Sequence, residues 1–120
     1  MHHKTFALKG QNILEPLSHF VKKYYRDSDD VYISEYTGGF LVAYEDYSFL
    51  NSNQMMVCLR LDSSEHEKGI IKIEVISGGG SSSLAMGDVF GSEKRRISEF
   101  AEELEKFCKG KNITLEERES

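Results

Sequence analysis

The chain has 120 residues, of which 39% are hydrophobic and one is proline. We therefore expect a single domain over residues 1–120 that buries a core without metal or disulfide support. Its 20 acidic and 15 basic residues give a net charge of -5, which opposes phosphate backbones and excludes nucleic acid as the expected partner. The N-terminus lacks the apolar segment of a signal peptide, and no run reaches the roughly 20 apolar residues of a membrane span. We predict a cytoplasmic protein with no membrane partner.

The N-terminal part predicts a short strand followed by a helix. Residues 4–9 alternate as a strand does, and residues 1–3 are expected to fray. Asn12 with Glu15 three positions later resembles a helix N-cap arrangement, and an apolar stripe at helical spacing then continues to about Tyr25.

A hairpin is predicted next, because residues 31–37 and 40–46 flank the glycine pair 38–39 and both glycines can adopt positive φ. A two-residue loop at this pair would place Thr37 opposite Phe40. We expect the hairpin face with more aliphatic bulk to meet the helices: Ile33, Glu35, Phe40, Val42 and Tyr44.

Two further strands are indicated by apolar residues at every second position in residues 55–62 and 70–76. The hydrophilic residues 62–69 connect them. Residues 46–54 carry too much apolar surface for a free loop, so we expect part of this segment to pack or to extend the hairpin.

The C-terminal part predicts an amphipathic helix with Ser92 as its cap and Gly110 just beyond its end. Residues 112–115 could add a short strand, and residues 116–120 are expected to fray. The apolar face of the helix consists of Ile97, Phe100, Ala101, Leu104, Phe107 and Cys108.

This order of elements, β-α-β-β-β-β-α, predicts an α+β fold. Each helix is apolar on one side only, so we expect a two-layer sandwich with both helices on one face of a curved, largely antiparallel sheet. TATA-binding-protein-like and reduced helix-grip folds share this order. Because such folds serve unrelated functions, the fold alone assigns none.

The segment VISGGGSSS followed by DVFGSEKRRISEFAEEL resembles a small uncharacterised family of bacterial proteins, mainly from Firmicutes. The shared pattern is a strand, a Ser-Gly-Gly joint, a short extended piece and a terminal amphipathic helix. The similar size extends the resemblance over most of the chain. It implies a bacterial intracellular domain of unknown function and carries over no activity or catalytic residue.

The glycine-serine joint is the sharpest chemical feature of the sequence. Its unshielded N–H groups and hydroxyls could form an anion-binding nest. No Gly-Lys-[Ser/Thr] ending and no G-x-G-x-x-G spacing accompanies them, and Asp88 adds negative charge nearby. A structural bend or mobile joint is the favoured alternative. The candidate anion-binding residues are Gly78, Gly79, Gly80, Ser81, Ser82 and Ser83.

No residue spacing identifies a metal site, a cofactor site or a catalytic pair. The acidic run 27–30 does not fit the EF-hand spacing, and His19 and His66 have no partner at ligand spacing. Cys58 and Cys108 occupy apolar positions, so we interpret them as small buried hydrophobic residues in a reducing compartment. We expect no cofactor, and an enzyme is the least favoured class.

The sheet face turned away from the helices is predicted to be covered, because it carries more large apolar residues than a wet face does. We expect a homodimer, and therefore a self-associating or partner-binding module. Three alternatives stay open: the concave face is only partly wet, residues 46–54 and the C-terminal tail cover it, or its concavity holds a small ligand. The candidate interface residues are Tyr32, Tyr36, Leu41, Met56, Arg60, Ile70 and Ile76.

Overall fold

The fold is that of a computed structural model, which describes residues 2–26, 30–48, 53–79 and 92–119. The elements in chain order are β1 (His2–Lys9), α1 (Leu14–Arg26), β2 (Tyr32–Tyr36), β3 (Gly39–Ser48), β4 (Asn53–Asp62), the short 3-10 helix η1 (His66–Lys68), β5 (Ile70–Gly79), α2 (Ser92–Cys108) and β6 (Thr114–Glu119).

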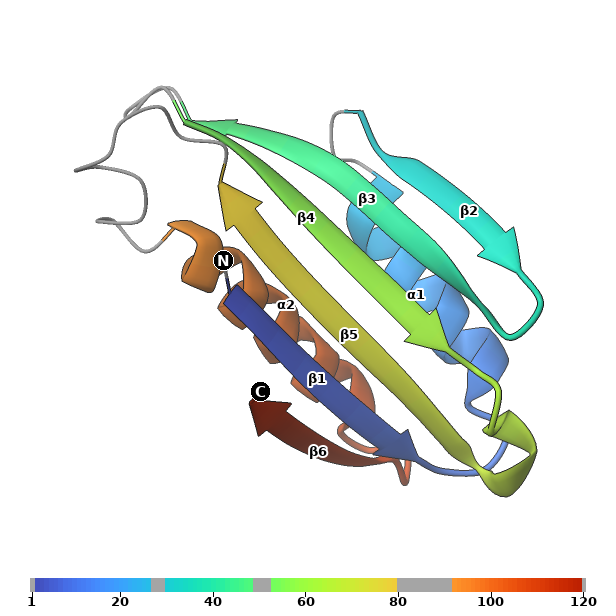
Figure 1. The fold of residues 1–120 in the computed structure, drawn as a ribbon. Coiled ribbons are helices and arrows are strands. Elements are labelled where there is room, and N and C mark those ends of the chain that lie inside the picture. Colours follow the sequence, from blue (N-terminus) through green and yellow to red (C-terminus); the bar gives the residue numbers. More distant parts are fainter. Residues whose placement is uncertain (1, 27–29, 49–52, 80–91, 120) are drawn as a thin grey trace.

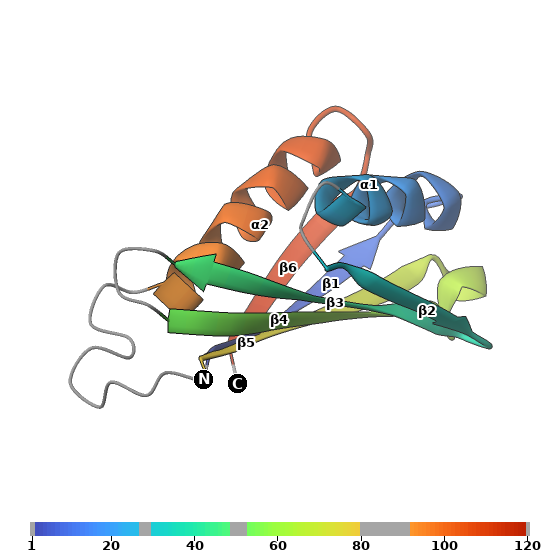
Figure 2. The same ribbon diagram turned by 90° about the horizontal axis from the view of Figure 1, so that it is seen from above.

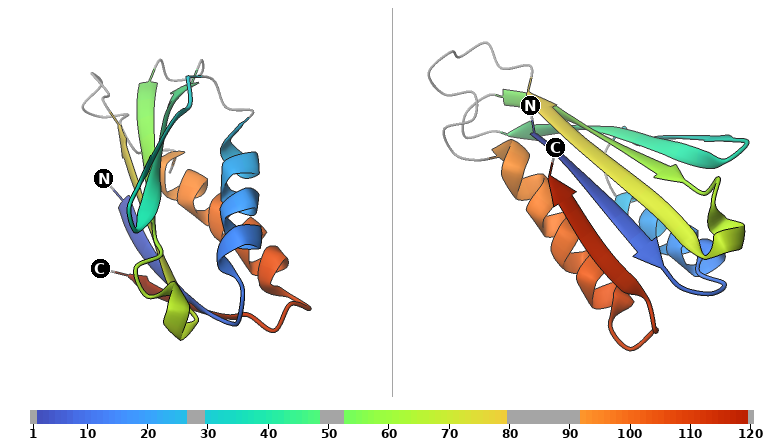
Figure 3. Two further views of the ribbon diagram at one scale, coloured as in Figure 1. Left: turned by 90° about the vertical axis from the view of Figure 1, so that its right-hand side faces the viewer. Right: turned by 60° about the horizontal axis from the view of Figure 1, so that its bottom comes forward.

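The six strands form one antiparallel sheet in the order β2-β3-β4-β5-β1-β6. Both helices lie on the same face of this sheet, and the strands bend around them (Figures 1, 2 and 3). The predicted α+β two-layer sandwich is therefore confirmed. The helices occupy the hollow side of the curved sheet (Figure 2), and a small ligand on the opposite face stays a prediction.

Both ends of the chain are better ordered than the sequence predicted. His2 pairs with Ser77 of β5, so fraying of residues 1–3 is wrong for His2 and His3. The strand expected near residues 112–115 runs instead from Thr114 to Glu119 as β6, and Lys4 pairs with Glu119. The predicted fraying of residues 116–120 is therefore wrong as far as Glu119, because this tail gains a full ladder of backbone hydrogen bonds along β1.

The core lies between the helices and the inner sheet face. Alternation in the strands and three-and-four spacing in the helices direct the apolar side chains into this layer, as predicted. Phe100 of α2 joins both layers, since its ring centre lies 5.9 Å from that of Phe6 and 5.8 Å from that of Tyr25. The apolar residues of the described chain with no exposed surface are Phe6, Leu8, Leu17, Val21, Leu61, Ile71, Ile73, Val75, Phe100 and Leu104.

The hairpin between β2 and β3 has the predicted faces but a different register. Tyr36 pairs with Gly39 and Glu35 with Phe40, so the two loop residues are Thr37 and Gly38. The predicted pairing of Thr37 with Phe40 is wrong by two residues. A shift of two keeps every side chain on its face, which is why the side facing the helices was still predicted correctly.

Residues 46–54 do extend the hairpin where the structure describes them. Asp46 pairs with Met55 and Ser48 pairs with Asn53, so residues 46–48 and 53–54 lengthen β3 and β4. Residues 49–52 lie outside the described part. Since these pieces and the C-terminal tail continue the sheet, neither covers the face opposite the helices, and the self-covered alternative fails for the described residues.

The buried Tyr25 predicts a loss of stability at alkaline pH. Burial, together with the nearby hydroxyls of Tyr44 and Tyr24, raises the pKa of Tyr25 well above its ordinary value of 10. The unfolded chain ionises at Tyr25 near pH 10 and the folded chain does not. The free energy of unfolding should therefore fall by about 1.4 kcal/mol per pH unit above that value. Urea unfolding of Tyr25→Phe beside the wild type should show a shallower decline above pH 10, and identical slopes would contradict this assignment.

Within the described ranges, no helix is long and apolar enough to cross a membrane.

Candidate interaction surface

The face opposite the helices, here called the open face, carries the alternate side chains of all six strands. Every residue that the sequence assigned to the predicted interface lies on it, because strand alternation determines the face directly. Ile70 is set apart from the others: it pairs with Lys9 at the η1 end of the sheet, whereas Ile76 pairs with His3 at the other end. Ile70 therefore does not belong to the same patch.

An apolar row crosses the open face from the β2 edge. Successive pairs place Tyr32 beside Ala43, Ala43 beside Cys58, and Cys58 beside Ile76. Tyr36, Leu41 and Met56 flank this row on β2, β3 and β4. We call these seven residues the apolar patch. Three of its side chains are strongly exposed: Tyr32 to 60%, Met56 to 48% and Tyr36 to 47% of their surface.

Charged residues beside the apolar patch form ion pairs with one another within the chain. Arg60 and Glu74 form an ion pair of 3.6 Å, and Glu74 also lies 2.8 Å from Nε2 of His3. Arg60 was predicted as an interface residue, and it sits next to Leu41 at the border of the patch. An incoming apolar surface would therefore meet paired charges at this border rather than an isolated one.

Asp62 holds the turn that follows β4 at the end of the open face. The Ser64 backbone N–H donates to Asp62 Oδ1 over 2.9 Å. Hydrogen bonds from the Ser64 side chain and backbone lower the pKa of this carboxyl below its usual range. The carboxylate therefore stays ionised and keeps this end of the face polar.

The two cysteines differ in position. Both thiols are free, and Cys108 is buried on α2, where burial raises its pKa. Cys58 is only half-buried, because it lies on the open face in the apolar row. Its prediction as a small buried hydrophobic residue is wrong, because alternation in β4 gives Val57 and Leu59 to the core and leaves Cys58 on the partly exposed opposite face.

The glycine-serine joint does not form a nest where it is described. Gly78 pairs with Met56 and Gly79 with Met55, so both belong to the β5 ladder and their backbone is extended. A nest needs consecutive N–H groups that converge, which this extended backbone does not provide at Gly78 and Gly79, and the anion site stays a prediction. Gly80, Ser81, Ser82 and Ser83 lie outside the described residues.

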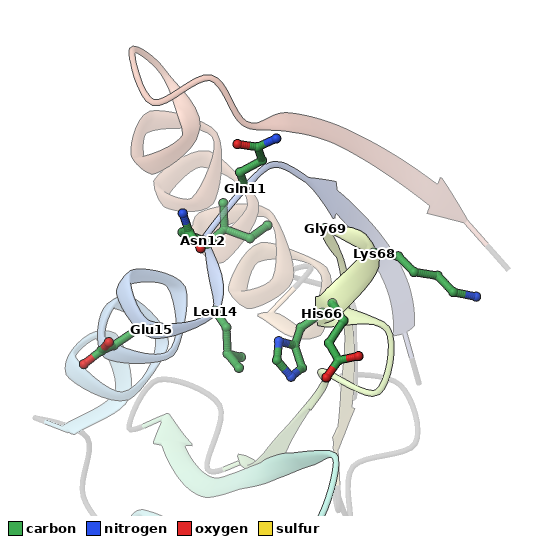
Figure 4. Close-up of a pocket in the computed structure, with 9 residues that line it drawn as sticks. Gln11, Asn12, Leu14, Glu15, His66, Lys68 and Gly69 are labelled. Carbon is green, nitrogen blue, oxygen red and sulfur yellow. The ribbon is translucent and has the colours of Figure 1, made fainter.

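A pocket of 710 Å³ lies at the opposite end of β5, between the loop that precedes α1 and the η1 turn (Figure 4). Backbone hydrogen bonding fixes the two segments, since Gly10 N–H donates to Gly69 C=O over 2.9 Å. His66 and Leu14 point into the space between them (Figure 4). None of its lining residues was predicted as a site from sequence: Gln11, Asn12, Ile13, Leu14, Glu15, His66, Glu67, Lys68 and Gly69.

The charge and the solvent exposure of the side chains that line this pocket do not indicate a class of ligand. Carboxylates at Glu15 and Glu67 oppose the cation of Lys68, so the lining favours neither sign of charge. The side chains of Glu15, His66 and Lys68 are all exposed to solvent. A specific small-molecule site normally buries its few polar groups among apolar ones. His19 lines a second, open hollow between α1 and α2, beside Phe20 and Phe107.

Among the described residues, no three histidine, cysteine, aspartate or glutamate side chains lie close enough to hold a metal ion. Comparison of the chain with protein-family models, with curated proteins and with solved structures gives no match. The functional argument therefore rests on the apolar patch of the open face.

Proposed function

We propose that this protein is a non-catalytic self-associating module, and that its interaction surface is the apolar patch of Tyr32, Tyr36, Leu41, Ala43, Met56, Cys58 and Ile76. The observation that carries the proposal is that Tyr32, Tyr36 and Met56, three of the four large hydrophobic side chains exposed in the described residues, lie on one face of the sheet. A wet antiparallel face alternates to polar residues instead. Tyrosine and methionine are also residue types enriched in the cores of protein interfaces.

A second copy of the same chain is the partner that this surface favours. A two-fold pairing closes after two subunits and needs only one self-complementary patch. The internal pairing of Arg60 with Glu74 lets two identical faces meet without opposing like charges at the border of the patch. Two free thiols fit a reducing compartment, and we include a cytoplasmic location in the proposal.

Sedimentation velocity at micromolar concentration tests the proposal. We expect a dimer for the wild type and a folded monomer for the double variant Tyr36→Glu with Met56→Glu, because two carboxylates would have to be buried without partners. Lys72→Glu is the matched control. It lies exposed on the same face outside the patch and changes the net charge by the same two units.

The control should remain a dimer. If the double variant keeps the wild-type sedimentation coefficient, the apolar patch is not the interface. If Lys72→Glu dissociates as completely as the double variant, net charge rather than the patch governs association.

A further inference from the structure

The strand β2 is the most apolar exposed element of the described chain. It pairs only with β3 and therefore forms one edge of the sheet (Figure 1). Four large hydrophobic side chains are exposed in the described residues, and three of them belong to this five-residue strand: Tyr32, Ile33 and Tyr36. Ile33 points toward the helix side, so β2 has exposed apolar side chains on both of its faces, next to its free edge.

The opposite edge of the sheet carries several charged side chains that discourage the addition of a further strand, and β2 lacks them. The edge strand β6 exposes Glu116, Glu117 and Arg118 in succession. Charged side chains of this kind discourage pairing with another strand. In β2 the only charged side chain is Glu35, and its carboxylate is already paired with Lys22 of α1. The β2 edge is therefore the end of the sheet where strand addition meets the least electrostatic opposition.

The hairpin register determines which backbone groups of β2 are free. A two-residue loop closes on a hydrogen-bonded pair, here Tyr36 with Gly39. Since bonded and non-bonded pairs alternate, Tyr36, Ser34 and Tyr32 direct their N–H and C=O groups toward β3. Ile33 and Glu35 direct theirs outward, where a further strand can bond them.

We propose that β2 of a second copy adds to this edge in antiparallel orientation, with the two-fold axis at Ser34. This inference rests on the proposed self-association but places the contact at the β2 edge, to which the apolar patch contributes Tyr32 and Tyr36. Ile33 of each copy then exchanges two backbone hydrogen bonds with Glu35 of the other. Tyr32 of each copy faces Tyr36 of the other in a non-bonded pair, where side chains approach most closely. The two sheets join into one of twelve strands, six from each copy.

The side chains of β2 select this axis over its neighbours. The strand Tyr-Ile-Ser-Glu-Tyr reads the same in both directions at its two tyrosines and its central serine. An axis at Glu35 would place two carboxylates opposite each other, which is destabilising. An axis at Ile33 would leave Tyr36 opposite Asp30. Only the axis at Ser34 matches both tyrosines with tyrosines and each glutamate with an isoleucine.

The test compares Glu35→Pro with Glu35→Thr by sedimentation. Both variants remove the contact with Lys22, but only proline removes the outward N–H, and an edge strand tolerates proline where its N–H faces solvent. We expect the dissociation constant of the dimer to rise at least about tenfold for proline relative to threonine, because two intermolecular hydrogen bonds are lost. Circular dichroism should show that both variants stay folded.

A crosslink tests the axis without relying on proline. In a Cys58→Ser background, Ser34→Cys should form a disulfide-linked dimer under mild oxidation, because the two Cα atoms at the axis are about 4.5 Å apart. Leu41→Cys is the control, since Leu41 pairs with Ser34 on the same face. Its two copies would be three strand spacings apart, about 14 Å, too far to crosslink.

The outcomes separate this inference from the proposed function. If the double variant Tyr36→Glu with Met56→Glu dissociates while Glu35→Pro stays dimeric and Ser34→Cys does not crosslink, the copies pack face to face. The edge geometry is then overturned and the proposed function stands. A monomeric wild type overturns both, and strands from other proteins become the candidates for the β2 edge.

Discussion

Phe100→Ala should destabilise the protein by about 3–5 kcal/mol, the usual cost of emptying a phenylalanine site in a packed core. The Phe100 side chain has no exposed surface. Its ring lies within 6.3 Å of four others, measured between centroids, and these rings belong to β1 and α1: Phe6, Phe20, Tyr24 and Tyr25. Truncation therefore removes contacts between the two helices and between helix and sheet at once. This is a large share of the 5–15 kcal/mol that holds a typical domain folded.

Urea unfolding of Phe100→Ala beside Phe107→Ala provides the measurement. Phe107 lies on the same helix and stacks on Phe20 with ring centres 4.7 Å apart, but it is only partly buried. We expect it to cost less than half as much, since its site opens to solvent and leaves no closed cavity. Equal losses would show that Phe100 does not organise the helix layer.

Gly39→Ala should cost about 3 kcal/mol or more, because a Cβ at this position would lie 1.9 Å from the backbone oxygen of Leu61. That atom belongs to β4 and cannot move without disturbing the ladder between β3 and β4. Gly38→Ala is the matched control: its φ is +97° but no atom lies within 4 Å of the added Cβ. It should cost only the strain of left-handed backbone, about 1–2 kcal/mol. Equal losses in urea unfolding would mean that the close approach does not require glycine at position 39.

The glycine pair at positions 38 and 39 shows why the sequence did not predict the register of the hairpin. Two adjacent glycines predicted a loop, yet Gly39 is needed for the approach of β4, a strand that starts 14 positions later at Asn53. The true loop is Thr37 and Gly38, and the register moved by two residues. Local turn preferences contain no information about such a contact between distant segments, whereas alternation in β3 still placed Val42 in the core.

The candidate surface was predictable in part for the same reason. Period-two alternation assigned Tyr32, Tyr36 and Met56 to one face without any knowledge of their neighbours. Strand order is a property of long-range pairing, so the sequence did not indicate that β2 is an edge strand. Ile33 was consequently expected in the core, although its edge position leaves 37% of its surface exposed. Ile70 shares the face of the patch, but alternation carries no information on its distance along β5 from Ile76, which separates it from the patch.

The two edges of the sheet give the proposal its physical basis. One edge carries exposed charges on β6, and the other carries two tyrosines, an isoleucine and a glutamate that is already paired within the chain. An apolar edge next to an apolar face is a liability for a chain that stays alone in solution, because it can add strands without limit. With a two-fold axis at Ser34, the β2 strands of two copies pair with each other, so neither β2 edge stays free. The charged β6 strands then form both ends of the joined sheet.

Native mass spectrometry of the gently purified full chain tests self-association most directly, since it reports the number of chains and any retained molecule together. The account predicts a principal species of twice the 13.7 kDa mass of one chain, with no additional mass, that gives way to single chains in the Tyr36→Glu with Met56→Glu variant. A wild-type protein found only as single chains at micromolar concentration, with or without a bound small molecule, would contradict it.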